Sequence, residues 1–554
     1  MNIARVGRGM IAGLLAAAVA LGIGQLIAGF VAPDASPVVA VGESSIGLTP
    51  PPVKNFAISA FGSHDKVVLV SGILALLAIF AAIVGALAMR RLAYGMASLA
   101  VFTAIGLAAA LTRPTASAGW ALPTLIGGAA AAGALRLLVR AAPAAVPKHA
   151  APPEDSEPGS YAGPPAVPDT PEPGQPAATR PGAAQAYRPL RPARASGPER
   201  RRFLVTGVAA AGTAVVAGLA GRLLSEHSSV TQAQAALRLP KPAHPAPPLP
   251  AGSNLRIPGL NSFITPNSSF YRVDTAIVLP EVPPSSWQLR IHGMVARELT
   301  ITFDELIRRP LTADYITLTC VSNPVGGPYV GNALWIGASL ASLLREAGIR
   351  AGAEQLFCTS VDGFTSGTPV QTVMDGRDAL LAMAMNGTAL PVEHGFPVRM
   401  VVPGLYGYVS ACKWITDINV TTWADVAYWA QPGNGWAQQA PIKTESRIDV
   451  PSGSAVLKPG PAPVAGVAWA QHKGIAAVEV RVDSGPWHEA RLAAVPDIDT
   501  WRQWVWEWDA TPGTHLITAR ATDATGYTQT AVQAPLEPNG ASGYPTVSVT
   551  VSSS

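Results

Sequence analysis

The sequence predicts three architectures in succession: apolar helices that cross a membrane, a mixed α+β domain, and an all-β sandwich. Of the 554 residues, 49% are hydrophobic and only 13% are charged, and the long uncharged runs lie within residues 1–226. Residues 252–450 mix short strand patterns with helical patches. Residues 460–554 contain short alternating strands separated by Gly, Pro and Asp, the pattern of a sandwich.

The membrane prediction depends on run length, because a helix needs about 20 apolar residues to cross a bilayer core. Four runs in residues 1–140 meet this requirement, and a fifth lies in residues 201–226. They are Met10–Val31, Val67–Met89, Leu92–Leu111, Trp120–Val139 and Phe203–Leu224.

Arginines at the span ends predict the orientation, since positively charged flanks stay in the cytoplasm. Arginines flank the five spans at positions 5 and 8, 90 and 91, 136 and 140, and 200 to 202, whereas Arg113 alone opposes the rule. Residues 141–200 are rich in Pro, Ala and Gly and predict a disordered cytoplasmic linker. The sequence therefore predicts a multi-pass protein of the cell (plasma) membrane whose last 330 or so residues are extracytoplasmic.

The run Arg200–Leu204, R-R-R-F-L, resembles the twin-arginine export signal, which here would be internal. A simple positive-inside cluster explains the same residues equally well. A twin-arginine signal would imply export of a domain that is already folded.

The net charge and the cysteine spacing limit which binding partners and cofactors the sequence predicts. The net charge is +4 and the pI is near 9.0, but many arginines flank apolar spans, which favours membrane lipid over nucleic acid. Cys320, Cys358 and Cys412 lack the spacing of zinc, iron–sulfur or covalent haem sites. No histidine lies inside a predicted span, so no haem is evident, and the spans are expected to serve as an anchor or a docking surface rather than as a haem relay.

Within residues 252–450, strand patterns cover Trp287–His292, Tyr315–Cys320, Gln355–Ser360 and Val398–Val402. Helical patches cover Phe303–Arg308, Leu340–Ala347 and Arg377–Met385. In the sandwich, strands are expected over Val478–Val482, Gln503–Trp508, His515–Thr522 and Tyr544–Val551.

The most informative stretch places Cys320 at the end of an alternating strand. A loop containing Asn323-Pro324 and Gly326-Gly327-Pro328 follows it. A thiol held between a strand and a Gly/Pro loop can bind a soft metal or act as a nucleophile. An isolated cysteine in an apolar strand is equally expected as a small buried hydrophobe.

This cysteine, its loop and the following W-I-G-x-x-L-x-x-L-L run, Trp335–Leu344, resemble the core of the sulfite oxidase family of molybdopterin oxidoreductases. The resemblance implies a molybdenum-molybdopterin cofactor, with Cys320 as its molybdenum ligand and catalytic residue. Cys358 and Cys412 match no ligand position and are interpreted as packing residues.

Four further stretches resemble the family's pterin pocket. The resemblance implies cofactor-binding roles for Asn267, Tyr271, Arg272, Ser360, His394, Arg399, Ser410 and Lys413. Cations and hydroxyl groups suit a phosphate and a polar ring. Each residue alone also has an ordinary structural explanation, and their shared order with Cys320 carries the prediction.

Residues 460–554 resemble the immunoglobulin-like dimerisation domain that follows the molybdenum domain in this family. The matching segments are Gly466–Ala470, Val478–Trp487 and Trp504–Trp508. This resemblance implies a homodimer.

Two departures bear on the substrate. The family's A-G-N-R-R run, whose arginine helps to hold an oxyanion, is replaced by Val321–Val325, V-S-N-P-V, and the family's catalytic tyrosine corresponds to Phe364. Tyr329, Tyr406 and Tyr408 remain candidate pocket residues without an assigned role.

Two functions follow. The favoured one is a molybdopterin oxidoreductase that transfers oxygen on a small oxide or sulfur compound, with a neutral sulfoxide preferred to sulfite. A separate partner would exchange its electrons. The alternative is a non-catalytic exported binding or adhesion protein on the same fold.

Overall fold

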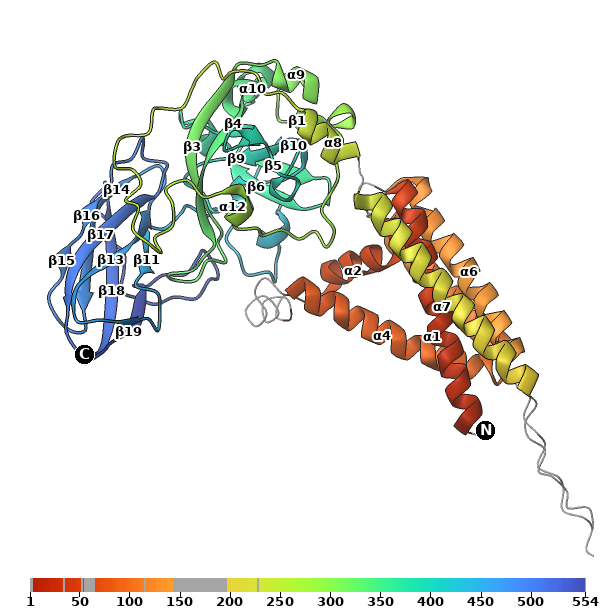
Figure 1. Ribbon diagram of the computed structural model, residues 1–554. Helices are drawn as coiled ribbons and strands as arrows, with labels where there is room; N and C mark the ends of the chain where they lie inside the picture. The colour runs from red at the N-terminus through yellow and green to blue at the C-terminus, as the bar shows by residue number, and fades with distance from the viewer. Residues whose placement is uncertain are drawn as a thin grey trace, which may run out of the picture.

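The N-terminal part of the computed structural model is a set of long apolar helices (Figure 1). The structure describes residues 3–32, 35–50, 53, 65–113, 116–142, 197–226 and 229–553. The helices are α1 (Ile3–Val31), α2 (Pro37–Leu48), α4 (Asp65–Ala88), α5 (Leu92–Leu111), α6 (Ala121–Ala141), α7 (Gly197–Glu226) and α8 (Ser229–Ala236). By length and composition, α1, α4, α5, α6 and α7 can each cross a membrane.

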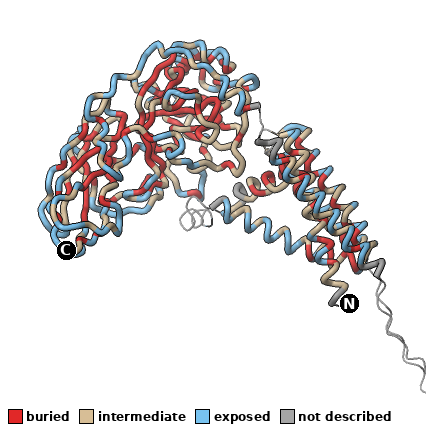
Figure 2. The backbone as a smooth tube through the Cα atoms, viewed as in Figure 1, coloured by how far each residue is buried: buried red, intermediate tan, exposed pale blue. Residues whose placement is uncertain are grey.

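Helix α1 packs against α4, α6 and α7. Glycines permit the closest approach, because a Cβ on Gly13 of α1 would overlap the backbone of Ala81 in α4. Helix α4 leaves large apolar side chains exposed along its length, among them Leu76, Ile79 and Ile83. In Figure 2, much of the tube of α4 has the colour of exposed residues. An apolar helix with this exposure suits lipid contact rather than water.

The five predicted spans correspond to these five helices. The sequence did not predict α2, which is short and contains Glu43, Ser44 and Ser45. The predicted linker of residues 141–200 falls mostly outside the described residues.

The middle of the chain forms one mixed sheet and one antiparallel sheet, which share a large apolar core. The first sheet has the order β2 (Leu299–Thr302), β1 (Gln288–Gly293), β10 (Ile415–Thr421), β5 (Gln355–Ser360), β6 (Thr365–Pro369). The second has the order β3 (Leu311–Thr319), β4 (Val330–Ser339), β7 (Leu380–Met385), β8 (Thr388–Ala389), with β9 (Arg399–Val401) also paired to β7. In the first sheet only the β1–β10 pair is parallel.

Short helices α9 (Phe303–Ile307), α10 (Leu340–Ala347), α11 (Val370–Met374) and α12 (Gly407–Ser410) connect these strands. Ser339 caps the start of α10 by accepting a hydrogen bond from the Ser342 N–H, and Gly348 ends it in the left-handed conformation. The predicted helix over Leu340–Ala347 and the predicted strand over Gln355–Ser360 agree with the structure.

The predicted helical patch over Arg377–Met385 is wrong, because Leu380–Met385 forms β7. All six residues of β7 are buried, and β7 pairs with β4 on one side and with β8 and β9 on the other. Leu, Ala and Met favour a helix locally, but burial within a sheet overrides this weak preference.

The C-terminal residues form two further sheets that enclose their own apolar core. One has the order β11 (Glu445–Val450), β13 (Gly460–Trp469), β17 (Arg502–Ala510), β16 (Arg491–Leu492). The other has the order β12 (Val456–Leu457), β19 (Thr546–Val551), β18 (Gly513–Asp523), β14 (Ile475–Val482), β15 (His488–Glu489). Their shared core includes Val464, Trp504, Val478 and Ile517.

This two-sheet region is joined to β3 by buried hydrogen bonds. The Trp501 N–H donates to Thr317 Oγ1 at 2.7 Å, and Gln471 Nε2 donates to the Thr317 carbonyl at 2.9 Å. The C-terminal region therefore supports the strand that leads to Cys320.

Candidate functional site

Cys320 is the first residue after β3, and the loop that follows holds it in place. Its N–H donates to the Tyr329 carbonyl at 2.9 Å, and its carbonyl accepts from the Asn323 N–H at 3.1 Å. Asn323 Oδ1 in turn accepts from the Tyr329 N–H at 2.8 Å. These hydrogen bonds fix Cys320 between the end of β3 and the loop, the position that the sequence predicted.

Cys320 lines a cleft that encloses about 940 Å³ of empty space, part of it open to solvent. Six of the nine predicted site residues line this cleft: Tyr271, Cys320, Ser360, His394, Arg399 and Lys413. They come from five separate segments of the chain, so the fold brings together residues up to 142 positions apart.

The other three predicted residues do not line the cleft. Ser410 Oγ donates to the carbonyls of Leu405 and Tyr406, within its own turn. Asn267 donates to the Met385 carbonyl and Thr388 Oγ1. Arg272 pairs with Asp274 at 2.9 Å and its side chain is 40% exposed. Asn267 still contributes indirectly, because its carbonyl lies 3.1 Å from His394 Nε2.

Arg399 is one of two buried cations in the cleft wall. Its guanidinium donates to the carbonyls of His394 and Ala411 and lies 5.0 Å from the centre of the Trp335 ring. Burial is the main cause that lowers its pKa to about 10. It remains charged at neutral pH, with its position set by neutral carbonyls.

Lys413 is the second buried cation. Its Nζ donates to Asp274 Oδ2 at 2.8 Å and to the Glu393 carbonyl at 3.1 Å, and it lies 4.6 Å from the centre of the Trp414 ring. Burial lowers its pKa to about 8, and Asp274 opposes this shift. Asp274 is shared between Lys413 and Arg272, so the wall favours a further anion such as a phosphate.

Two uncharged groups add hydrogen-bonding capacity. Burial lowers the pKa of His394 to about 4, so its ring is neutral at pH 7. Ser360 is buried, and its Oγ has no hydrogen-bond partner among the described residues. A buried polar atom without a partner is costly unless a ligand completes it, which fits a polar cofactor in this cleft.

Opposing effects act on the pKa of the Cys320 thiol. Burial is the main cause that raises its pKa, whereas the Ser322 N–H, 3.4 Å from Sγ, and the charge of Lys413 lower it. In the described part of the chain, no group of three or more His, Cys, Asp or Glu side chains could hold a metal ion. One thiolate thus fits a metal that brings its remaining ligands with an organic cofactor.

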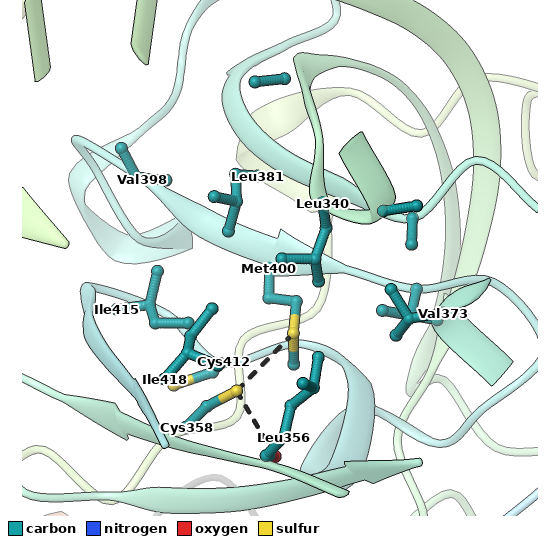
Figure 3. Close-up of a cluster of buried hydrophobic side chains, with 14 of the residues drawn as sticks. Leu340, Leu356, Cys358, Val373, Leu381, Val398, Met400, Cys412, Ile415 and Ile418 are labelled. Atoms are coloured by element: carbon teal, nitrogen blue, oxygen red, sulfur yellow. Dashed lines mark hydrogen bonds between the residues drawn. The ribbon is translucent and has the colours of Figure 1, made fainter. Parts of the chain in front are cut away.

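Cys358 and Cys412 do not line this cleft. Both belong to the apolar core, where Figure 3 shows them among buried side chains such as Met400. Cys358 Sγ contacts Met400 Sδ and the Leu356 carbonyl. Burial raises the pKa of Cys358 to about 12 and that of Cys412 well above its usual value. Both are inert packing thiols, as the sequence interpretation had them.

The sequence missed several cleft residues. Asp274, Asp362, Trp429 and Trp436 line the cleft, whereas of the three candidate tyrosines only Tyr408 does so. Asp274 lies two positions after Arg272, a predicted pocket residue, and this proximity was the only sequence feature that could have indicated its place in the cleft. The two tryptophans lie in the segment after β10, where the sequence has no periodic pattern to place them.

Comparisons with known proteins identify the family to which the chain belongs. Residues 276–429 match the family described as oxidoreductase molybdopterin binding domain. Chicken (Gallus gallus) sulfite oxidase is 32% identical over 324 residues, which cover 50% of this chain and 70% of that protein. Mouse (Mus musculus) mitochondrial sulfite oxidase is 29% identical over 287 residues, 44% of this chain and 52% of that protein.

Among solved structures, the sulfane dehydrogenase SoxCD from Paracoccus pantotrophus is 26% identical, with a TM-score of 0.45. The match covers 51% of this chain and 80% of that chain. This chain spans only about half the length of the mouse and rat enzymes.

Proposed function

Because the chain belongs to the sulfite oxidase family of molybdopterin-dependent oxidoreductases, we propose that it transfers an oxygen atom on a small neutral oxide, with a sulfoxide as the expected type. We further propose that Cys320 ligates molybdenum and that the electrons come from a separate partner. The observation that carries this proposal is the cleft itself, in which a single fixed thiol faces two buried cations and an unpartnered hydroxyl.

When bound, the cofactor would supply the metal centre at which oxygen is exchanged and electrons are held. Cys320 would bind as a thiolate, so its proton is lost on binding. Lys413 and Arg399 would hold the phosphate, and Ser360 Oγ would find its missing partner. Neutral His394 gives its Nε2–H to the Asn267 carbonyl, which leaves Nδ1 as a hydrogen-bond acceptor.

The preference for a neutral substrate is argued from the charges near Cys320. Val321 and Ser322 follow it in the cleft wall, where the family pattern has an arginine further along the same run. Arg399 and Lys413 are already held by carbonyls or by Asp274. An oxyanion would need its own compensating cation, whereas a neutral oxide would not.

The test uses the full chain, purified in detergent from a host that makes the cofactor. With a reduced viologen dye as electron donor, the protein should reduce dimethyl sulfoxide, and Cys320→Ser should abolish turnover without changing the unfolding curve. Sulfite-dependent reduction of ferricyanide that exceeds sulfoxide reduction would contradict the neutral-substrate assignment.

We also propose that the five apolar helices anchor the protein in the cell membrane, with residues 252–554 on the extracytoplasmic side. Arg113, which opposes the positive-inside rule, forms an ion pair with Glu43 of α2 and lies 5.1 Å from the centre of the Trp120 ring. Arg200–Leu204 would then serve as an internal twin-arginine signal.

Residues 252–450 are proposed as the oxidoreductase domain and 460–554 as an immunoglobulin-like dimerisation domain. The separate apolar core of the C-terminal sheets supports this division. A mass near that of two chains in multi-angle light scattering, corrected for detergent, would support the dimer, and a single-chain mass would exclude it.

A further inference from the structure

Four aromatic side chains in the wall of the cleft, Phe364, Tyr408, Trp429 and Trp436, are not used by the proposed cofactor site. We call them the aromatic wall. Phe364 precedes β6, Tyr408 lies in α12, and the two tryptophans lie in the segment between β10 and β11. Three separate parts of the chain thus place rings in the cleft that also contains Cys320.

The rings of the aromatic wall contact one another. The centre of the Trp436 ring lies 6.0 Å from that of Tyr408 and 6.5 Å from that of Trp429. Tyr428 links the remaining member, since its ring centre lies 5.1 Å from Trp429 and 6.0 Å from Phe364. These separations are those of favourable tilted and edge-to-face ring pairs.

Hydrogen bonds fix the segment that carries the tryptophans. Tyr408 Oη donates to the Ala437 carbonyl at 2.6 Å, next to Trp436. Asn434 Nδ2 donates to the Tyr428 carbonyl at 2.6 Å, and the Tyr428 N–H donates to Thr365 Oγ1 at 2.9 Å. Because these hydrogen bonds already order the aromatic wall, it loses little conformational entropy when a ligand binds.

The charge beside the aromatic wall is negative. Asp362 lines the cleft two positions before Phe364, and its carboxylate accepts from the Phe364 N–H at 3.1 Å. The cations of the cleft, Arg399 and Lys413, are held elsewhere by carbonyls and Asp274. This part of the cleft therefore disfavours anions and suits a neutral, apolar group that can stack on rings.

From this geometry we propose that the aromatic wall binds the organic substituent of the substrate, so that the enzyme selects oxides with an aromatic group over the smallest oxides. This inference rests on the proposed oxide reduction and adds the substrate class. Reduction of methyl phenyl sulfoxide takes two electrons from the reduced donor dye and two protons from the buffer. It breaks the S–O bond and releases methyl phenyl sulfide and water.

The first measurement compares kcat/KM of the full chain for methyl phenyl sulfoxide and dimethyl sulfoxide, with reduced viologen as the donor. We expect a ratio of about 10 in favour of the aryl substrate, the discrimination of a modest apolar contact. Trp436→Leu and Trp429→Leu should each lower the ratio to about 2. A ratio that stays the same in both variants would overturn the proposal.

Two further variants separate the ring from other effects. Trp436→Phe keeps a ring but removes the indole N–H, which has no acceptor among the described residues, and should preserve the ratio. Trp487→Leu is the matched control, since Trp487 packs against Arg481 and Arg520 in the C-terminal sheets. A ratio that falls equally in the control would also contradict the aromatic wall.

Binding provides a readout that does not need turnover. Saturation-transfer NMR should give a Kd for methyl phenyl sulfoxide that rises about tenfold in Trp436→Leu and stays unchanged in Trp487→Leu. If no sulfoxide is reduced but this binding pattern holds, oxide reduction fails and the aromatic wall stands. Equal Kd values for methyl phenyl sulfoxide in all variants would overturn the role proposed for the aromatic wall, whatever the activity.

Discussion

Substitution of Asp274 by Asn tests whether Lys413, a buried cation of the cleft, binds an anionic ligand. Asp274 and Lys413 have side chains that are 3% and 10% exposed, and their charged atoms are 2.8 Å apart. In the empty protein, Asp274→Asn leaves Lys413 without its carboxylate. When a cofactor phosphate is present, that phosphate would compensate the same lysine.

The magnitude follows from the titration of Lys413. If the lysine gave up its proton at pH 7, the cost relative to an ordinary pKa of 10.5 would be about 5 kcal/mol, which sets the upper limit. Removal of one partner from a buried pair costs about 3–5 kcal/mol. The amide oxygen of Asn still accepts a hydrogen bond, so we expect about 3 kcal/mol for empty protein. With cofactor bound, we expect about 1 kcal/mol.

The assay is thermal unfolding followed by tryptophan fluorescence. Trp120 is the one tryptophan of 13 that precedes residue 287, so the signal reports on the cleft and the C-terminal sheets. Tm should fall by about 6–10 °C without cofactor and by about 3 °C with it. Glu298→Gln is the control, because its pair with Arg290 is more than half exposed, and it should change Tm by about 1 °C at most. Equal losses with and without cofactor would refute the reasoning.

Three other predictions follow from the same structure. Ser360→Ala should leave the free energy of unfolding within about 0.5 kcal/mol while it lowers the pterin content, and a large stability loss with normal pterin would contradict the cofactor role. Burial raises the pKa of Glu445 from 4.5 to about 8, so the unfolded chain ionises first and stability falls as pH rises between these values. In urea titrations Glu445→Gln should lessen this loss by up to about 1.4 kcal/mol per pH unit, and an unchanged pH dependence would refute it. A short bis-maleimide should link Gly42→Cys to Ile277→Cys, because a Cβ at position 42 would lie 2.7 Å from Ile277 Cδ1 and the native cysteines are buried; failure of this pair to link would contradict the contact between α2 and the segment around Ile277.

The sequence predicted the parts of the fold that depend on local patterns. Run length identified the five apolar helices, and the helical patch predicted over Leu340–Ala347 coincides with α10. The strand over Leu380–Met385 was missed because its composition favours a helix and only its neighbours in the sheet decide otherwise.

The cleft was predicted where motif residues act through their own side chains. Cys320, Arg399 and Lys413 are of this kind and line the cleft together. Ser410 lies three residues before Lys413, but its hydroxyl donates to carbonyls of its own turn and does not reach the cleft. Residues such as Trp436 reach the cleft through a long connecting segment, whose path is set by hydrogen bonds such as that from Tyr408 Oη. No pattern in the sequence encodes that path.

The most direct test of the central claim is the molybdenum and pterin content of the purified full chain and of Cys320→Ala, from a host that makes the cofactor. Elemental analysis and fluorescence of the oxidised pterin should give about one molybdenum and one pterin per wild-type chain. The variant should retain both through Arg399 and Lys413, because the metal's remaining ligands belong to the cofactor, but it should lose turnover. Folded wild-type protein that contains neither would contradict the assignment of this cleft as a cofactor site.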